Sequence, residues 1–139
     1  MGRGTKDRNE TIIPNGDTTM KFLALVKSSE KYRTEGPPPA LMEAMGKYVQ
    51  ESFASGRVVD TGGLKSSAAA MRLRIEHGKL TVTDGPFTEA KEVVGGWAIL
   101  KVNSRAEALE NCRTFMELHT QHWPGWEGTS EVFEMEEYG

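Results

Sequence analysis

Residues 80–102 read LTVTDGPFTEAKEVVGGWAILKV, and this stretch decides the fold. The alternating residues before position 84 predict the end of a strand, and the sequence DGPF at 84–87 predicts a sharp turn. Glycine reaches backbone angles that are closed to other residues, and proline fixes its own. The apolar run at 97–102 predicts the next strand. The turn therefore joins two strands and fixes the direction of the Asp84 carboxylate.

Further strands are expected on both sides of this turn. Residues 21–26 are apolar on both alternating faces, which is typical of a central strand. Residues 57–60 predict a short second strand, and residues 71–82 alternate around His77-Gly78 and predict a β-hairpin with one face in water. Residues 130–136 predict an edge strand. Loops are expected at 28–36 and 61–65.

Two helices are expected between these strands. Pro39 suits the first turn of a helix over 40–55 that Gly56 ends, and Ser104 with Glu107 forms a capping box for a helix that reaches about residue 118. Helical spacing predicts the buried residues: Met42, Met45, Val49 and Phe53 in the first helix, and Leu109, Cys112 and Met116 in the second.

The order strand, helix, strand, hairpin, helix, strand predicts an α+β fold of the ferredoxin-like βαββαβ type with an added β-hairpin. Residues 20–139 then form a single domain behind a flexible N-terminal tail at 1–19, which is polar and lacks periodicity. Two helices cover only one face of a sheet, so a first strand with two apolar faces supports a homodimer in which the other face is covered as well.

The sequence VTDGPFTEAKEVVGGWAILKV at 82–102 resembles the signature of the DGPF proteins, a branch of the YCII-related family. The resemblance extends from about Met20 to the C-terminus and implies a dimeric α+β barrel. DGPF-like domains are encoded near or fused to bacterial sigma factors of the extracytoplasmic-function type, which implies transcription-related signalling as one context. Related YCII-type proteins also carry a histidine after a proline at the start of the first helix. Residues 38–42 hold no histidine here, so that family's histidine-aspartate dyad cannot be transferred to this chain.

Composition excludes several classes of function. The net charge is −3, and residues 127–139 contain five acids and no Lys or Arg, which argues against a nucleic-acid surface. No apolar run approaches the roughly 20 residues of a membrane span, and no secretory signal is evident, so a soluble cytoplasmic protein is expected. The single cysteine, Cys112, excludes an internal disulfide and is expected to be a buried thiol. No cofactor is expected, because Gly62-Gly63 and Gly95-Gly96 lack the phosphate-binding patterns.

Asp84 is the first candidate catalytic residue. A carboxylate held by a rigid turn beside a pocket can act as a general base or orient a polar ligand. The alternative is an acid that only caps its own turn. Phe87 and Trp97 are candidate ligand-binding residues, although aromatic residues that flank a strand more often fill the core. Lys65, in the expected loop at 61–65, is a further candidate ligand contact.

His119 and His122 are the second pair of candidate catalytic residues. If the helix continues through them, they share one of its faces, and histidine titrates near neutral pH. A metal is not expected there, because a catalytic zinc needs a third protein ligand and no third histidine is near in sequence. A histidine satisfied at a helix end or an interface is the remaining alternative.

Two functions remain open from the sequence. The first is the binding of a small polar or aromatic molecule, with lyase or isomerase activity as one form of it. The second is a non-enzymatic interaction or regulatory module with a protein partner. A cavity into which Asp84 is directed would favour the first, and an exposed apolar patch outside the dimer interface would favour the second.

Overall fold

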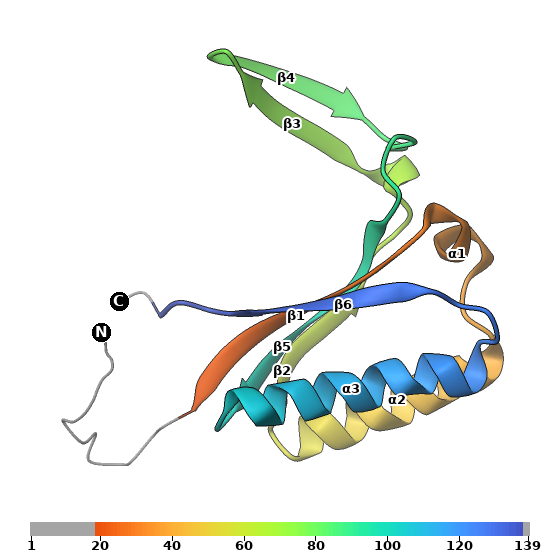
Figure 1. The fold of residues 1–139 in the computed structure, drawn as a ribbon, viewed down its shortest axis with the longest axis vertical. Helices are drawn as coiled ribbons and strands as arrows, with labels where there is room; N and C mark the ends of the chain where they lie inside the picture. Colours follow the sequence, from red (N-terminus) through yellow and green to blue (C-terminus); the bar gives the residue numbers. More distant parts are fainter. Residues whose placement is uncertain (1–18, 138–139) are drawn as a thin grey trace.

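The computed structural model describes residues 19–137, and its centre is a four-stranded antiparallel sheet (Figure 1). The strands are β1 (Met20–Ser28), β2 (Val58–Gly63), β5 (Val93–Val102) and β6 (Gly128–Glu134), and their order across the sheet is β2-β5-β1-β6. The two longest helices follow β1 and β5 in the chain. This is the ferredoxin-like α+β arrangement that the order of elements predicted.

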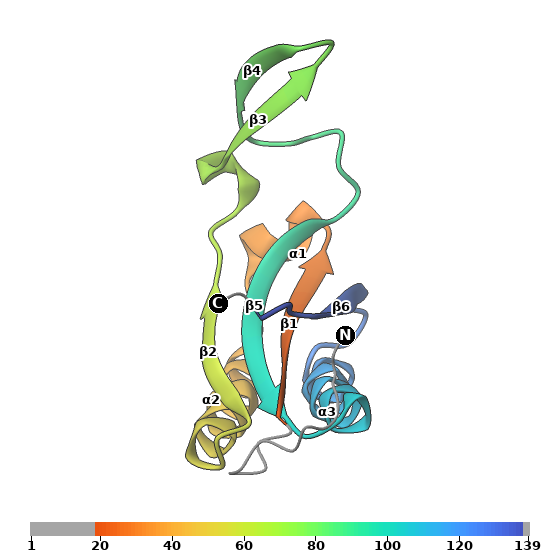
Figure 2. The same cartoon turned by 90° about the vertical axis from the view of Figure 1, so that its left-hand side faces the viewer.

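Helices α2 (Pro39–Ala54) and α3 (Arg105–His122) lie on the same side of the sheet (Figures 1 and 2). Pro39 is the first residue of α2, where its missing N–H costs nothing. At the start of α3 the Ser104 hydroxyl accepts from the Glu107 amide at 3.1 Å, and the Glu107 carboxylate accepts from the Asn103 amide at 2.9 Å. The capping interaction predicted for Ser104 is confirmed.

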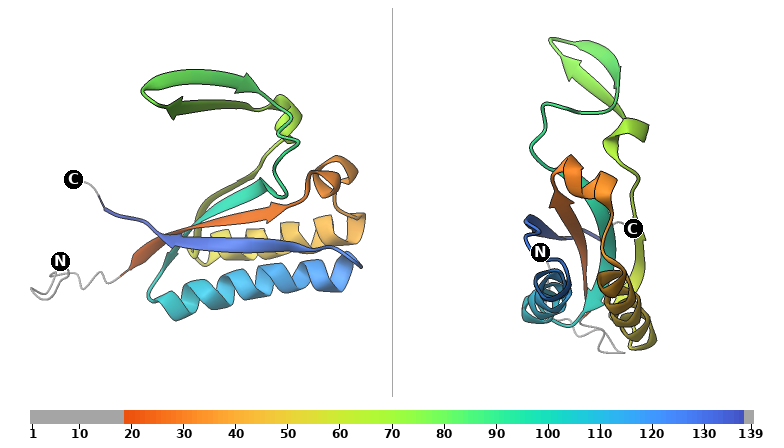
Figure 3. Two further views of the ribbon diagram at one scale, coloured as in Figure 1. Left: turned by 45° about the horizontal axis from the view of Figure 1, so that its top comes forward. Right: turned by 90° about the vertical axis from the view of Figure 1, so that its right-hand side faces the viewer.

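The predicted hairpin consists of β3 (Met71–Glu76) and β4 (Lys79–Asp84), which pair only with each other (Figure 3). His77 at φ 51° and Gly78 at φ 76° form the tight turn between them. The hairpin extends away from the four-stranded sheet, on the side opposite α2 and α3 (Figures 1 and 3). One of its faces carries apolar side chains that are all exposed: Met71, Leu73, Ile75, Leu80 and Val82.

The DGPF turn fastens the base of this hairpin to the rest of the fold. The Gly85 amide donates to the Ala70 carbonyl at 2.8 Å, and the Phe87 amide donates to the Ser67 hydroxyl at 3.0 Å. A side chain on Gly85 would overlap the carbonyl oxygen of Ser67, so only glycine fits there. Ser67 in turn donates through its amide and its hydroxyl to the carboxylate of Glu30.

Two predicted loops are partly wrong. Residues 28–36 contain a short helix, α1 (Glu30–Glu35), which ends at Gly36 with φ 77°. Glu30 stabilises its first turn, where a negative charge meets the partly positive end of a helix. Residues 61–63 belong to β2, because Gly62-Gly63 pair with Trp97 and Gly96 of a β5 that is longer than predicted. Glycine lowers strand propensity, but ladder hydrogen bonds prevail here.

The predicted buried stripes of the helices are partly wrong. Met42 and Phe53 of α2 are exposed, as is Leu109 of α3. Instead α2 buries Leu41 and Ser52, and α3 buries Ala108, Asn111 and His119. Residues 41 and 52, like 108 and 119, are eleven positions apart, which is close to three turns and returns to the same helix face. The small side chains of Ser52 and Ala108 let the helices approach their neighbours. A pattern of large apolar residues does not predict that such small residues are buried.

The hydrophobic core is small and lies at one end of the sheet. Its buried members are Phe22, Val58, Leu100, Val102 and Ala108. Cys112 packs against this cluster and is half-buried, in partial agreement with the expected buried thiol.

The face of the sheet away from the helices is also apolar at its centre. Strand register places Leu23 opposite Ile99 on β5 and opposite Phe133 on β6, so these three side chains lie on one face, with Leu25 two residues along β1. The exposed fraction of Phe133 is 50%. No helix of the described residues covers this face (Figure 3).

Two further predictions concern the ends of the chain and the membrane. The flexible tail predicted at 1–19 lies almost entirely outside the described residues. Between residues 19 and 137, no helix is both long and apolar enough to cross a membrane.

Candidate functional site

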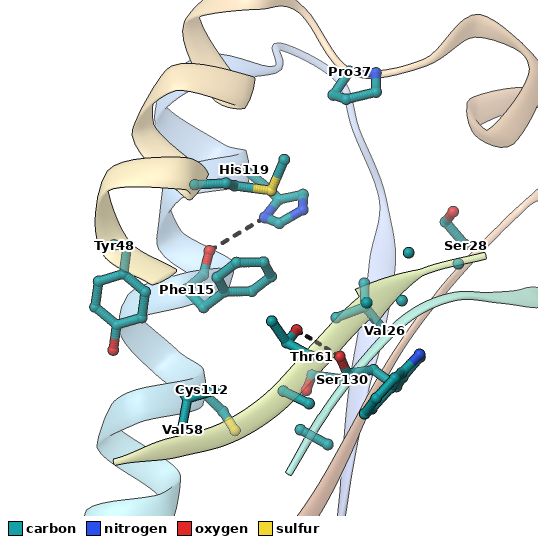
Figure 4. Close-up of a pocket in the computed structure, with 18 of the residues that line it drawn as sticks. Val26, Ser28, Pro37, Tyr48, Val58, Thr61, Cys112, Phe115, His119 and Ser130 are labelled. Atoms are coloured by element: carbon teal, nitrogen blue, oxygen red, sulfur yellow. Dashed lines mark hydrogen bonds between the residues drawn. The ribbon is translucent and has the colours of Figure 1, made fainter. Parts of the chain in front are cut away.

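A cavity of about 390 Å³ lies between the helices and the sheet, beside the small core (Figure 4). Its floor is the helix-facing side of the sheet, its walls are α2 and α3, and α1 together with the segment after α3 closes one end. This volume falls within the range of pockets that bind small molecules.

The cavity exists because the sheet beneath it carries small side chains. Ala24 of β1, Ala98 of β5 and Ser130 of β6 all line it. The neighbouring positions on the same face of the two central strands are Phe22, two residues before Ala24, and Leu100, two residues after Ala98. These two side chains are large and fill the core. The change from large to small residues along the same strands leaves an unfilled space under the C-terminal half of α3.

His119 is buried and lines this cavity from α3. Its Nδ1 lies 3.2 Å from the carbonyl oxygen of Phe115, one turn earlier (Figure 4). A carbonyl only accepts, so Nδ1 carries the proton in the neutral ring and Nε2 is left as an acceptor. Burial lowers the pKa of His119, and the bond to Phe115 opposes this only in part. The side chain therefore presents a neutral imidazole to the cavity.

Aromatic rings surround His119. The ring centroid of Trp126 lies 4.4 Å from that of His119, and Phe115 packs edge-on at 5.4 Å. Tyr32 of α1 makes an edge-to-face contact with Trp123 at 5.4 Å between centroids. Tyr32, Phe115, Trp123 and Trp126 all line the cavity. Such walls suit a flat, largely apolar ligand, since aromatic pairs gain from stacked and edge-to-face contacts.

Polar groups lie at the far end of the cavity. Tyr48 of α2 donates its hydroxyl hydrogen to Asn111 of α3, whose backbone carbonyl is 3.1 Å away and whose side-chain oxygen is also in contact. Burial raises the pKa of Tyr48, and the charge of Arg57 opposes that shift. Burial also raises the pKa of the Cys112 thiol, which lines the same wall. At neutral pH these groups are uncharged, and they offer hydrogen bonds and not charge.

The structure brings together only two of the residues predicted for the site. His119 and Trp97 are both among the residues that line the cavity. The indole of Trp97 packs over Gly62, where a Cβ would lie 3.0 Å from its Nε1. The others lie outside the lining: Asp84, His122, Lys65 and Phe87.

Asp84 is exposed at the end of β4, opposite Met71. No described residue forms a hydrogen bond or ion pair with its side chain. Phe87 packs under Arg72, whose guanidinium carbon lies 4.0 Å from the ring centroid. Lys65 is exposed in the segment after β2, and His122 is half-buried at the end of α3. In a single chain the DGPF turn and the cavity are therefore separate features.

Sequence analysis missed much of the cavity. Tyr32 and Arg33 belong to α1 and not to the predicted loop, and Trp126 is a lining residue that was not among the predicted site residues. For Trp126, the sequence does hold a signal: two tryptophans lie at 123–126, directly after the helix that carries His119.

No three His, Cys, Asp or Glu side chains between residues 19 and 137 are grouped so that they could hold a metal ion.

Comparison with known proteins adds a family. No curated protein matches the chain significantly. The family model of the YCII-related domain matches residues 20–115, which include β1, α2, the hairpin, the DGPF turn and the part of α3 that begins the cavity wall. Because this match covers well over half of the chain, the protein belongs to the YCII-related domain family.

Proposed function

We propose that this protein binds a small aromatic or polar molecule in the cavity between the sheet and its two long helices. The observation that carries the proposal is the buried, neutral imidazole of His119 on the cavity wall, with Nε2 available as an acceptor. A buried polar side chain is costly unless it is hydrogen-bonded, and a ligand can supply the missing bond. Apolar walls with few polar groups are the usual design of small-molecule sites.

If the ligand is turned over, lyase or isomerase chemistry fits this site best. A neutral imidazole can accept a proton from a ligand carbon and return it at another position. The low pKa of His119 keeps it in the accepting form at neutral pH. Asp84 remains a separate proposal, because one chain does not place it in the cavity lining.

A thermal-shift screen of small aromatic and polar metabolites tests this proposal. A ligand at 100 times its dissociation constant stabilises a protein by about 2.7 kcal/mol. We expect a hit whose stabilisation is lost in His119→Gln and kept in His122→Gln, a matched change on the same helix outside the lining. Stabilisation that is lost in Asp84→Ala and kept in His119→Gln would move the site to the DGPF turn.

We also propose that the protein is a cytoplasmic homodimer whose subunits meet through the open faces of their sheets. The apolar side chains of Leu23, Ile99 and Phe133 on this face support the proposal, because no helix of the described chain covers them. Sedimentation should give a dimer for wild type and a monomer for Leu25→Glu. Leu109→Glu, an equal change on the exposed side of α3, should remain dimeric. A wild type that stays monomeric at high concentration would contradict the proposal.

A second candidate function is a regulatory module that meets a protein partner in sigma-factor signalling. The exposed apolar face of the hairpin favours it, since an isolated two-stranded hairpin is only marginally stable in water. Ile75, for example, is 74% exposed. A sigma factor that binds wild type and fails to bind Ile75→Glu, while the dimer persists, would support this role. Equal capture of both forms would argue against it.

A further inference from the structure

The wall of the cavity carries a single positive charge. Arg33 of α1 is the only Lys or Arg among the described residues that line the cavity, and none of the described lining residues is an Asp or Glu. The remaining lining residues are uncharged at neutral pH, as His119 is through the low pKa described above. The cavity lining therefore combines one cationic side chain with aromatic and neutral polar ones.

The position of Arg33 is well defined. Its Nη2 donates to the carbonyl oxygen of Leu64, which follows β2. Gly95 leaves the space that the side chain occupies, because a Cβ at that residue would lie 2.8 Å from Nη1 and 2.9 Å from Cδ. The guanidinium group is thus seated against the edge where β2 and β5 meet, and a different residue at 95 would displace it.

The charge of Arg33 has no compensating carboxylate in the part of the chain that the structure describes. None of the ion pairs there includes it. Its Nε is buried and forms no hydrogen bond with a described residue. A guanidinium that is partly removed from water loses hydration, which an anion in the cavity would replace. Arginine is also the side chain best matched to a carboxylate, since its planar fork can donate two parallel hydrogen bonds.

Aromatic rings line the same cavity as Arg33. Tyr32 precedes Arg33 on α1, and its ring lies 6.1 Å from that of Trp126, which in turn packs on His119. A ligand that matches both the guanidinium and the rings has one anionic group and a flat apolar body. A single arginine suits a monoanion, because a phosphate monoester brings nearly two charges and is usually held by several donors.

We propose that the ligand of this cavity is an aromatic monocarboxylic acid whose carboxylate pairs with Arg33 while its ring lies against Trp126 and His119. This inference rests on the proposed function, because it names the class of molecule that the same cavity takes. Arg33 is then a specificity-determining residue, which selects acids over neutral molecules of the same shape.

Isothermal titration calorimetry with two matched probes tests the inference. The probes are trans-cinnamate and cinnamyl alcohol, which share a ring and a chain length and differ in charge. Wild type is compared with Arg33→Gln, with Arg33→Lys, which keeps the charge, and with Arg113→Gln, which changes an exposed arginine of α3 outside the lining. Circular dichroism melting checks that each variant is folded.

We expect cinnamate to bind wild type at least about tenfold more tightly than the alcohol, which is the size of a charge-assisted hydrogen bond. Arg33→Gln should abolish this preference and leave binding of the alcohol unchanged, Arg33→Lys should retain part of it, and Arg113→Gln should retain all of it. Equal binding of both probes to wild type, or a preference that survives in Arg33→Gln, would overturn the inference and leave cavity binding standing. Failure of both probes to bind wild type would overturn the proposed cavity site as well.

Discussion

The Nδ1 atom of His119 lies 3.2 Å from the carbonyl oxygen of Phe115, and this contact fixes the imidazole within a cavity that several aromatic residues line. Only 6% of the residue is exposed. The bond sets the tautomer, and burial keeps the ring neutral, so one backbone carbonyl determines which nitrogen can meet a ligand. The relationship links the helical geometry of α3 directly to the chemistry of the site.

The first prediction concerns pH. Because burial lowers the pKa of His119, the unfolded chain binds a proton more readily than the folded one as the pH falls. The contribution of the neutral His119 imidazole to the free energy of unfolding is complete above the ordinary histidine pKa of about 6.5. It is lost as the pH falls below that value. Urea unfolding of wild type between pH 5 and 8 should show this loss.

A substitution at His119 tests whether this residue causes the pH dependence of the free energy of unfolding. His119→Gln should flatten the dependence below pH 6.5, because it removes the buried group whose pKa is lowered. An unchanged slope in His119→Gln would show that other groups cause the effect.

The second prediction concerns the start of α3. Ser104→Ala removes the acceptor for the Glu107 amide and should lower the free energy of unfolding by about 1 kcal/mol. Ser104→Asp keeps an acceptor at the same position and serves as the control. Urea denaturation measures both, and equal stability of the alanine and aspartate variants would contradict the role assigned to the cap.

The third prediction concerns the attachment of the DGPF turn. Ser67 is buried and connects the Phe87 amide to the Glu30 carboxylate. Ser67→Ala leaves the Phe87 amide without its acceptor and removes one hydrogen bond to Glu30, whose carboxylate still accepts from the Ser67 amide. The loss should cost roughly 1–3 kcal/mol. Hydrogen exchange at the Phe87 amide should accelerate, while exchange in the centre of β1 should not. Exchange that is unchanged at Phe87 would mean that the turn is held by other contacts.

The fourth prediction uses the thiol of Cys112 as a reporter. Burial raises its pKa, so little of it is thiolate at neutral pH, and the thiolate is the nucleophile. Iodoacetamide at pH 7 should modify Cys112 more slowly than a cysteine in a short unfolded peptide. Because the residue lines the cavity, a bound ligand should slow the reaction further. A rate equal to that of the peptide would contradict the burial of this wall.

Sequence periodicity was sufficient to predict the order of strands and helices along the chain and the position of the hairpin. The alternation around His77-Gly78, the proline at the start of α2 and the serine cap of α3 are local signals, and local geometry decides them. The ferredoxin-like topology follows because only a few arrangements connect such elements without crossing. These features can be predicted without knowing the tertiary contacts.

The cavity could not be found in this way. It depends on Ala24, Ala98 and Ser130 facing the C-terminal half of α3, and on a short helix α1 that brings Arg33 to its end. Small residues on a strand look the same in sequence whether a larger neighbour fills the space above them or not. The exposed Met42 beside the buried Leu41 shows the same limit, because a helix pattern can be rotated by one residue before tertiary contacts are known.

The conspicuous DGPF motif directed attention to Asp84, while the cavity lies elsewhere in the chain. The motif's backbone hydrogen bonds to Ala70 and Ser67 give it a structural task that does not use the carboxylate. The proposal of Asp84 as a catalytic residue still has its own test in the Asp84→Ala variant described above.

The most direct test of the cavity site is an NMR titration of the protein carrying carbon-13 in its methionine methyl groups, with trans-cinnamate as the probe. Met42 and Met45 line the cavity, whereas Met71 lies on the exposed hairpin and does not. We expect the methyl resonances of Met42 and Met45 to shift and saturate with a common dissociation constant, while that of Met71 stays in place. A saturating shift at Met71 with none at Met42 and Met45 would place binding outside the cavity and contradict the account.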